Sequence, residues 1–280
     1  MDGRRPKLGH AGTVDFAINP ADGIRIAYRA SGSTSGTGPP IVMVHGTALS
    51  QAIWRGFGYS RGLGIDHRVI TLDLRGHGRS DKPHAQSAYS NELFVGDVLA
   101  VLDQLGVDRA HYLGYSLGGR VGFSLAATHP ERMLSFVTAG GAPRIGHGSF
   151  DRVFFPGCVE VLESGDMDRF LDAWERSGAT LDATTMAAFR ANDALALAAY
   201  MRAAEDDAGV TGAALASIRL PTLLLVGSDD SARLRSAMDA LEAMPSATLR
   251  VLDGANHSDT LRHPEALPAV REFIASVATA

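Results

Sequence analysis

Residues 111–119, HYLGYSLGG, constrain the fold more than any other stretch of this chain. An apolar run ends in Gly-Tyr-Ser-Leu-Gly, and a helical pattern follows directly. This order predicts a strand, a sharp turn that carries Ser116, and a helix. Small residues two positions before and after Ser116 let the strand and helix approach closely, and they tolerate the strained backbone that exposes the serine Oγ. Taken alone, the stretch is also compatible with a Gly-rich strand-to-helix turn that has no catalytic role.

Short apolar or β-branched runs alternate with helical patterns along most of the chain. A turn at residues 19–23 separates two β-like runs and predicts a hairpin, and residues 31–40 are expected to form a flexible polar loop. The alternation predicts an α/β fold with a parallel sheet and helices on both faces. Further strands are expected at residues 41–44, 68–72, 110–113, 134–138, 222–226 and 248–252.

The alternation breaks in one place, where only helical patterns occur. We therefore expect residues 141–218 to form a helical lid inserted into a core made of residues 13–140 and 219–280. Residues 1–12 are expected to be a disordered leader.

The composition is ordinary for a globular protein with a substantial core. The chain has 280 residues, 45% hydrophobic and 20% charged, with a net charge of −5, which offers no electrostatic footprint for nucleic acid. Its one cysteine, Cys158, cannot form an internal disulfide, which fits a reducing compartment. The N-terminal stretch has no apolar segment typical of a signal peptide, and no apolar run is long enough to span a membrane. We expect a cytoplasmic protein with no membrane partner.

Chemistry-bearing residues follow the predicted strands. Because ligands of parallel sheets bind at the carboxyl ends of the strands, the polar residues there are the candidates for a site. They are His45 to Thr47, Ser116, the acids Asp229 and Asp230, and His257. A serine, an acid and a histidine in that chain order match a hydrolase whose serine sits on a strand-to-helix turn.

With these motifs in place, the chain resembles the α/β-hydrolase superfamily, in particular its lidded esterase, lactonase, haloperoxidase and meta-cleavage hydrolase group. The resemblance covers roughly residues 20–278. It implies an eight-stranded, mostly parallel sheet with a helical lid, and a cofactor-free serine mechanism. The motifs that carry it are HGT at 45–47, DLRGHGRSDKP at 73–83, GYSLGG at 114–119, PTLLLVGSDD at 221–230 and GANH at 254–257.

Roles for individual residues follow from the chemistry and the resemblance together. Ser116 is expected to be the nucleophile and His257 the base that activates it, because a serine hydroxyl is too weakly acidic to attack unaided. The oxyanion needs backbone N–H donors. Leu117 offers one at the start of the following helix, and the resemblance assigns the other to Thr47.

The acid that orients His257 could be either of two neighbours. Side chains of adjacent residues in an extended segment point opposite ways, so only one of Asp229 and Asp230 can face the imidazole. The resemblance assigns the role to Asp230, three residues after Gly227. Asp229 is then expected to face solvent or to cap the next helix.

The lid is expected to select the substrate. Most of its large aromatic side chains should pack the lid, and some should line a pocket that favours an apolar or aromatic acyl group. Residues 144–207 also hold twelve acidic residues against six arginines, which disfavours polyanionic substrates. The seven aromatic residues in this part are Phe150, Phe154, Phe155, Phe170, Trp174, Phe189 and Tyr200.

The sequence thus predicts a serine hydrolase that cleaves a small, largely apolar ester or lactone through an acyl-enzyme. Cleavage of a carbon–carbon bond next to a carbonyl, peroxyacid formation, or slow turnover in a ligand sensor are the alternatives on the same triad. Epoxide and haloalkane hydrolases of this superfamily need a carboxylate nucleophile, and position 116 is a serine. No metal is expected, because His257, Asp259 and His263 lack a recognised ligand spacing.

Overall fold

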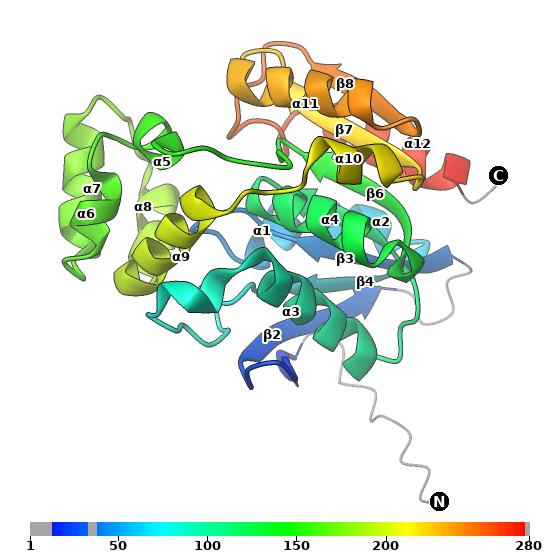
Figure 1. Cartoon of the computed structure of the whole chain (residues 1–280), viewed down its shortest axis with the longest axis horizontal. Coiled ribbons are helices and arrows are strands. Elements are labelled where there is room, and N and C mark those ends of the chain that lie inside the picture. The colour runs from blue at the N-terminus through cyan, green and yellow to red at the C-terminus, as the bar shows by residue number, and fades with distance from the viewer. Residues whose placement is uncertain (1–12, 33–37, 278–280) are drawn as a thin grey trace, which may run out of the picture.

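The computed structural model describes residues 13–32 and 38–277. Within them the strands form one eight-stranded sheet in the order β1-β2-β4-β3-β5-β6-β7-β8 (Figure 1). β1 and β2 form an antiparallel hairpin, and β2 also pairs antiparallel with β4. All other neighbouring strands are parallel. The mostly parallel eight-stranded sheet is therefore confirmed. The strands are β1 (Asp15–Ile18), β2 (Arg25–Gly32), β3 (Gly38–Val44), β4 (His67–Leu72), β5 (Ala110–Tyr115), β6 (Met133–Ala139), β7 (Thr222–Gly227) and β8 (Ala247–Leu252).

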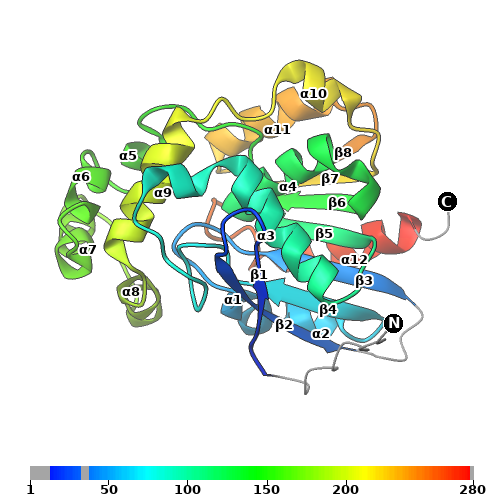
Figure 2. The ribbon, with the colours of Figure 1, turned by 60° about the horizontal axis from the view of Figure 1, so that its bottom comes forward.

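Helices cover both faces of this sheet, as the alternation predicts (Figure 2). Helices α3, α4 and α11 pack on one face, and α1, α2 and α12 pack on the other. Two short 3-10 helices, η1 (Gln86–Tyr89) and η2 (Pro130–Arg132), accompany them. The α-helices are α1 (Ala52–Gly56), α2 (Tyr59–Leu63), α3 (Asn91–Gln104), α4 (Leu117–Thr128), α5 (Ser149–Val153), α6 (Cys158–Leu162), α7 (Met167–Arg176), α8 (Ala183–Arg190), α9 (Ala194–Asp206), α10 (Gly212–Ser217), α11 (Ser231–Ala243) and α12 (Ala266–Val277).

The apolar run of strand β3 is explained by the burial of both of its faces. Val42 and Val44 belong to the core under α3 and α4, while Ile41 and Met43 belong to the core under α1, α2 and α12. Successive side chains of a strand point to opposite faces, and both faces of this sheet are covered. A continuous apolar run is therefore the pattern that a central strand of this sheet requires.

A helical insertion lies between β6 and β7, as expected. It contains α5 to α10, and Figure 1 shows α5 to α8 gathered beside one end of the sheet. Helix α10 packs against α4 and α11, over the sheet, so the part that projects ends with α9. None of the helices in the described part of the chain is long and apolar enough to cross a membrane.

One local expectation was wrong. Residues 31–40 were expected to be loop; 33–37 lie outside the described residues, but β2 extends to Gly32, which pairs with Arg68, and β3 begins at Gly38, which pairs with His67. The register shifts between Gly38 and Ile41, where Pro39 and Pro40 lie. Proline has no N–H to donate to a β-ladder, so the pairing of β3 with β4 is irregular at these two residues. The polar, turn-rich composition of this stretch gave no sign that two strands extend into it. The expected leader at 1–12 lies outside the described residues.

Candidate active site

Ser116 stands on the turn between β5 and α4 in a strained conformation. Its φ is 51° and ψ is −109°, a region that non-glycine residues rarely adopt. The glycines on either side make this turn possible. A Cβ on Gly114 would collide with the carbonyl of Gly118, and a Cβ on Gly118 would collide with the carbonyl of Val44. The G-x-S-x-G spacing is therefore a steric requirement of this strand-to-helix turn.

The structure brings Ser116, His257 and Asp230 together from three separate loops. His257 Nε2 lies 3.0 Å from Ser116 Oγ, and His257 Nδ1 lies 2.6 Å from Asp230 Oδ2. A carboxylate can only accept, so Nδ1–H donates to Asp230 and leaves Nε2 free to accept the serine proton. Tyr115, which the sequence analysis missed, stacks on the His257 ring at 5.5 Å and donates from its hydroxyl to the His257 carbonyl at 3.0 Å. The imidazole is thus held on both sides.

The two neighbouring acids have different environments. Asp230 turns its Oδ2 to His257, and its Oδ1 accepts the backbone N–H of Arg233 at 3.3 Å, so it also caps α11. Asp229 is exposed and accepts from the Ser228 hydroxyl. Of the two roles expected for Asp229, the structure has the solvent-facing one, because Asp230 itself is the helix cap.

Thr47 and Leu117 line the cavity together with Ser116. Leu117 is the first residue of α4, so its N–H has no acceptor within the helix and the positive end of the helix dipole lies there. Gly46 lets the other loop approach, since a Cβ at that position would lie 3.1 Å from the Ser116 Cβ and 2.9 Å from the Tyr115 ring. Gly118 N–H donates to the His45 carbonyl at 3.0 Å and ties the two loops together.

His45 supports this loop from the core side. Its Nδ1 donates to the Gly46 carbonyl at 2.8 Å, and its Nε2 accepts the Leu74 N–H at 3.1 Å. Burial lowers the pKa of His45, which keeps the ring neutral, as this pair of hydrogen bonds requires. His45 therefore shapes the loop, because both of its ring nitrogens are used by backbone groups of the surrounding loops.

A cavity of about 550 Å³ opens beside Ser116 and is covered by the lid. More of the lid aromatics line it than expected, because only Phe155 and Phe170 of the seven do not. The wall also includes Phe57 and Tyr115 from the core. This size and lining suit a small molecule with an apolar body. The lid aromatics that line the cavity are Phe150, Phe154, Trp174, Phe189 and Tyr200.

The charges of the cavity wall differ from what the lid composition suggested. Arg120, Arg233 and Arg262 line it, against Asp182 as the one carboxylate contributed by the lid. Arg262 is exposed and covers the Phe57 ring at 4.9 Å. The acidic excess of the lid lies away from the cavity, where Glu160 and similar residues form exposed ion pairs. The acidic composition of the lid therefore does not describe the wall of the cavity.

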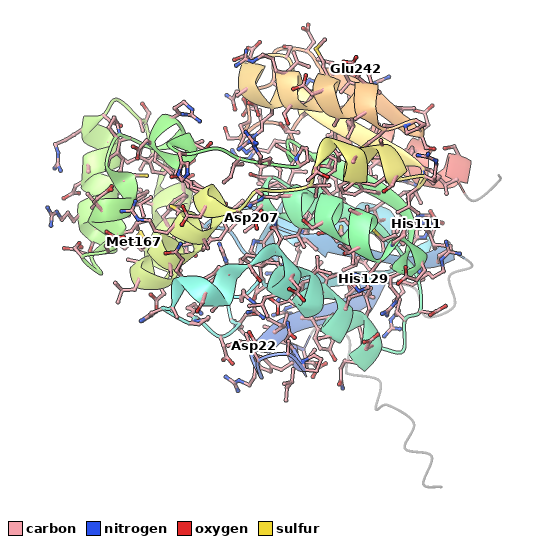
Figure 3. All side chains as sticks on the ribbon, viewed as in Figure 1. Asp22, His111, His129, Met167, Asp207 and Glu242 are labelled. Atoms are coloured by element: carbon pink, nitrogen blue, oxygen red, sulfur yellow. The ribbon has the colours of Figure 1, made fainter. Side chains whose placement is uncertain are left out.

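The two inner arginines differ in their partners. Arg120 on α4 is buried and forms an ion pair with Asp207 at 3.0 Å. Asp207 is labelled in Figure 3 and follows the end of α9, on the side of α4. Arg233 forms no ion pair within the part of the chain that the structure describes. Burial lowers the pKa of Arg233, and the nearby charge of Asp230 opposes that change. The sequence carried no signal for these positions, because neither lies in the lid or in a strand-end loop.

Comparisons with known proteins agree with this architecture. Residues 39–164 match a family model described as "alpha/beta hydrolase fold". The chain is 36% identical over 115 residues to Epoxide hydrolase B of Mycobacterium tuberculosis (strain ATCC 25618 / H37Rv), a match that covers 41% of this chain and 32% of that protein. It spans less than half the length of the first curated relatives that it matches.

Solved structures are similar over nearly the whole chain. An esterase, RhEst1, from Rhodococcus sp. ECU1013 is 28% identical with a TM-score of 0.77, covering 94% of this chain and 99% of that one. An enol-lactonase from Burkholderia xenovorans LB400 is 27% identical with a TM-score of 0.76, covering 91% and 98%. The similarity therefore includes the helical insertion as well as the sheet.

Proposed function

Since this chain has the α/β-hydrolase fold, we propose that it is a serine hydrolase that cleaves a small carboxylic ester or lactone through an acyl-enzyme on Ser116. The observation that carries the proposal is the hydrogen-bonded chain from Ser116 through His257 to Asp230 at the wall of a largely apolar cavity under the lid. The similarity to an esterase and to an enol-lactonase supports the same chemistry.

In the acylation step, His257 Nε2 takes the proton of Ser116 as Oγ attacks the carbonyl carbon. Asp230 holds the imidazole in the required tautomer and stabilises the imidazolium that forms. The negative charge that develops on the carbonyl oxygen is stabilised by the N–H groups of Thr47 and Leu117. His257 then gives its proton to the leaving alkoxide, and the acyl group stays on Ser116.

In the deacylation step, water takes the place of the alcohol. His257 removes a proton from the water, which attacks the acyl carbon, and the proton returns to Ser116 as the acid leaves. A lactone follows the same path, with the alcohol and the acid in one product molecule. Besides the substrate and one water molecule, these steps use only side chains and backbone groups of this chain.

The cavity narrows the substrate class. Its aromatic wall favours an acyl group with an apolar or aromatic body, and its volume of about 550 Å³ limits the size to that of a small molecule. The Arg233 guanidinium, which lacks an ion pair within the described residues, favours a substrate that also carries a negative charge away from the scissile bond.

The test is a panel of aryl esters, alkyl esters, lactones and vinylogous diketones, assayed with the wild type and with Ser116→Ala. The proposal expects sustained ester or lactone hydrolysis that Ser116→Ala reduces by about 10⁶-fold, because nucleophile and base act as a unit. A serine-directed phosphonate should label the wild type at Ser116. Cleavage of the diketones alone, or a single slow turnover, would overturn the ester or lactone proposal.

A further inference from the structure

Two lid residues reach past the cavity and hold the loop that carries Thr47. Asn192, between α8 and α9, donates from Nδ2 to the Ala48 carbonyl at 2.9 Å. Tyr200, on α9, has its hydroxyl 3.1 Å from Thr47 Oγ1. Adjacent residues of one core loop are therefore hydrogen-bonded to the lid, more than 140 residues away in sequence.

The loop needs this support because its backbone is strained. Ala48 has a φ of 58°, in the left-handed region that costs a residue with a Cβ about 1 kcal/mol or more. It is also buried, with 1% of its surface exposed, so solvent cannot compensate for a misplaced peptide group. On the core side, His45 holds the Gly46 carbonyl, and Asp73 accepts the Gln51 N–H at 2.7 Å. Thr47 and Ala48, which lie between these two core contacts, are hydrogen-bonded to the lid instead.

Tyr200 is a rigid support. It is 2% exposed, and its ring packs edge-on against His77, Phe94 and Phe150 with centroids between 5.8 and 5.9 Å apart. The ring cannot swing away without disturbing these contacts, so the position of the Tyr200 hydroxyl is set by the packing of α9 on the core. A hydroxyl fixed in this way restricts the side chain and backbone of Thr47.

We propose that Asn192 and Tyr200 are positioning residues through which the lid holds the Thr47 N–H in place for the charge that develops on the carbonyl oxygen. The inference rests on the proposed function and goes beyond it, because it gives the lid a part in the chemical step as well as in substrate choice. A displaced α9 would slow acylation even for a substrate that touches none of the lid aromatics.

The first test is Tyr200→Phe, which removes one oxygen and keeps the ring packing. We expect kcat for a small acetate ester to fall roughly 10- to 100-fold with KM within about 2-fold, because loss of a full oxyanion donor costs 10²- to 10³-fold and this change only loosens one. The bimolecular rate of Ser116 labelling by a phosphonate should fall by the same factor. Tyr89→Phe is the matched control, since Tyr89 packs on the Tyr200 ring but donates to the Pro83 carbonyl instead.

A double-mutant cycle separates a specific contact from general loosening of the lid. Thr47→Val removes the other hydroxyl of the pair, so the double variant Thr47→Val/Tyr200→Phe should be no slower than the slower single variant. Asn192→Ala should lower kcat in the same direction, although it also loses bonds to the Ala188 and Phe189 carbonyls.

The outcomes distinguish the inference from the proposed function. A wild type that hydrolyses esters, with Tyr200→Phe as fast as Tyr89→Phe, would overturn the inference and leave the proposed function standing. Additive losses in the cycle would also overturn it, since they would show that Thr47 and Tyr200 act separately. A wild type that neither turns over esters nor reacts with the phosphonate would overturn the proposed function itself.

Discussion

The carboxylate of Asp230 serves two partners at once, His257 Nδ1 at 2.6 Å through one oxygen and the Arg233 N–H at 3.3 Å through the other. The helix cap holds the carboxylate in the rotamer that faces the imidazole. Asp230→Asn should therefore lower kcat by roughly 10⁴-fold, because an amide cannot stabilise the imidazolium and favours the wrong tautomer. Asp229→Asn should stay within a few-fold. Steady-state kinetics of both variants on one ester checks this, and the reverse ranking would assign the acid to Asp229.

The lid aromatics should divide into two classes. Trp174 lines the cavity, so Trp174→Ala is expected to change the ranking of acyl groups while Ser116 can still be labelled by a phosphonate. Phe170 is 1% exposed and packs inside the lid, so Phe170→Ala should cost about 3–5 kcal/mol of stability without changing that ranking. Substrate profiles and denaturant unfolding of the two variants measure the difference. An unchanged profile for a folded Trp174→Ala enzyme would contradict the assignment of this wall.

Arg233 should make the enzyme prefer substrates that carry a negative charge. For an ester whose acyl chain ends in a carboxylate, Arg233→Gln is expected to lower kcat/KM by roughly 10-fold or more, since hydrogen bonds to charged groups contribute about 1.5–3 kcal/mol. The neutral amide or methyl ester analogue should change only a few-fold. Arg235→Gln is the control, because Arg235 is exposed on the same helix and does not line the cavity. Equal losses on both substrates would show that Arg233 does not read substrate charge.

Buried histidines, His77 and His111 together with His45, should make the fold sensitive to mild acid. Burial lowers the pKa of His77 to about 3 and of His111 to about 4. The unfolded chain binds a proton at each position near pH 6.5 and the folded chain does not, so stability falls as the pH drops below 6.5. Each histidine should contribute a slope of about 1.4 kcal/mol per pH unit between pH 6.5 and 4.

Urea unfolding at pH 7, 6 and 5 measures that slope. His111→Leu should be flatter by one histidine's share, because it removes one of the buried protonation sites. A free energy of unfolding that stays constant from pH 7 to pH 5 in the wild type would contradict the assignment of both rings as neutral and buried.

The sequence by itself determined the parts of this protein that follow from local pattern. Apolar runs such as 41–44 predict buried parallel strands, since a strand covered on both faces must be apolar throughout. The glycines around Ser116 predict the strand-to-helix turn, because no larger residue fits there. Chain order together with the rule that ligands bind at strand ends brought Ser116 and His257 to one edge of the sheet. The choice of Asp230 over Asp229 needed the family resemblance as well.

Tertiary structure alone decided how the lid faces the core. The twelve acidic residues of 144–207 disfavoured polyanionic substrates, yet of these only Asp182 lines the cavity, while arginines from α4 and α11 also form its wall. Thr47 and Tyr200 are 153 residues apart, and nothing in either local sequence records their hydrogen bond. The physical reason is that hydrophobic periodicity and turn chemistry act over a few residues of sequence. Which side chains of the lid contact which side chains of the core depends instead on how a whole helix packs on the sheet.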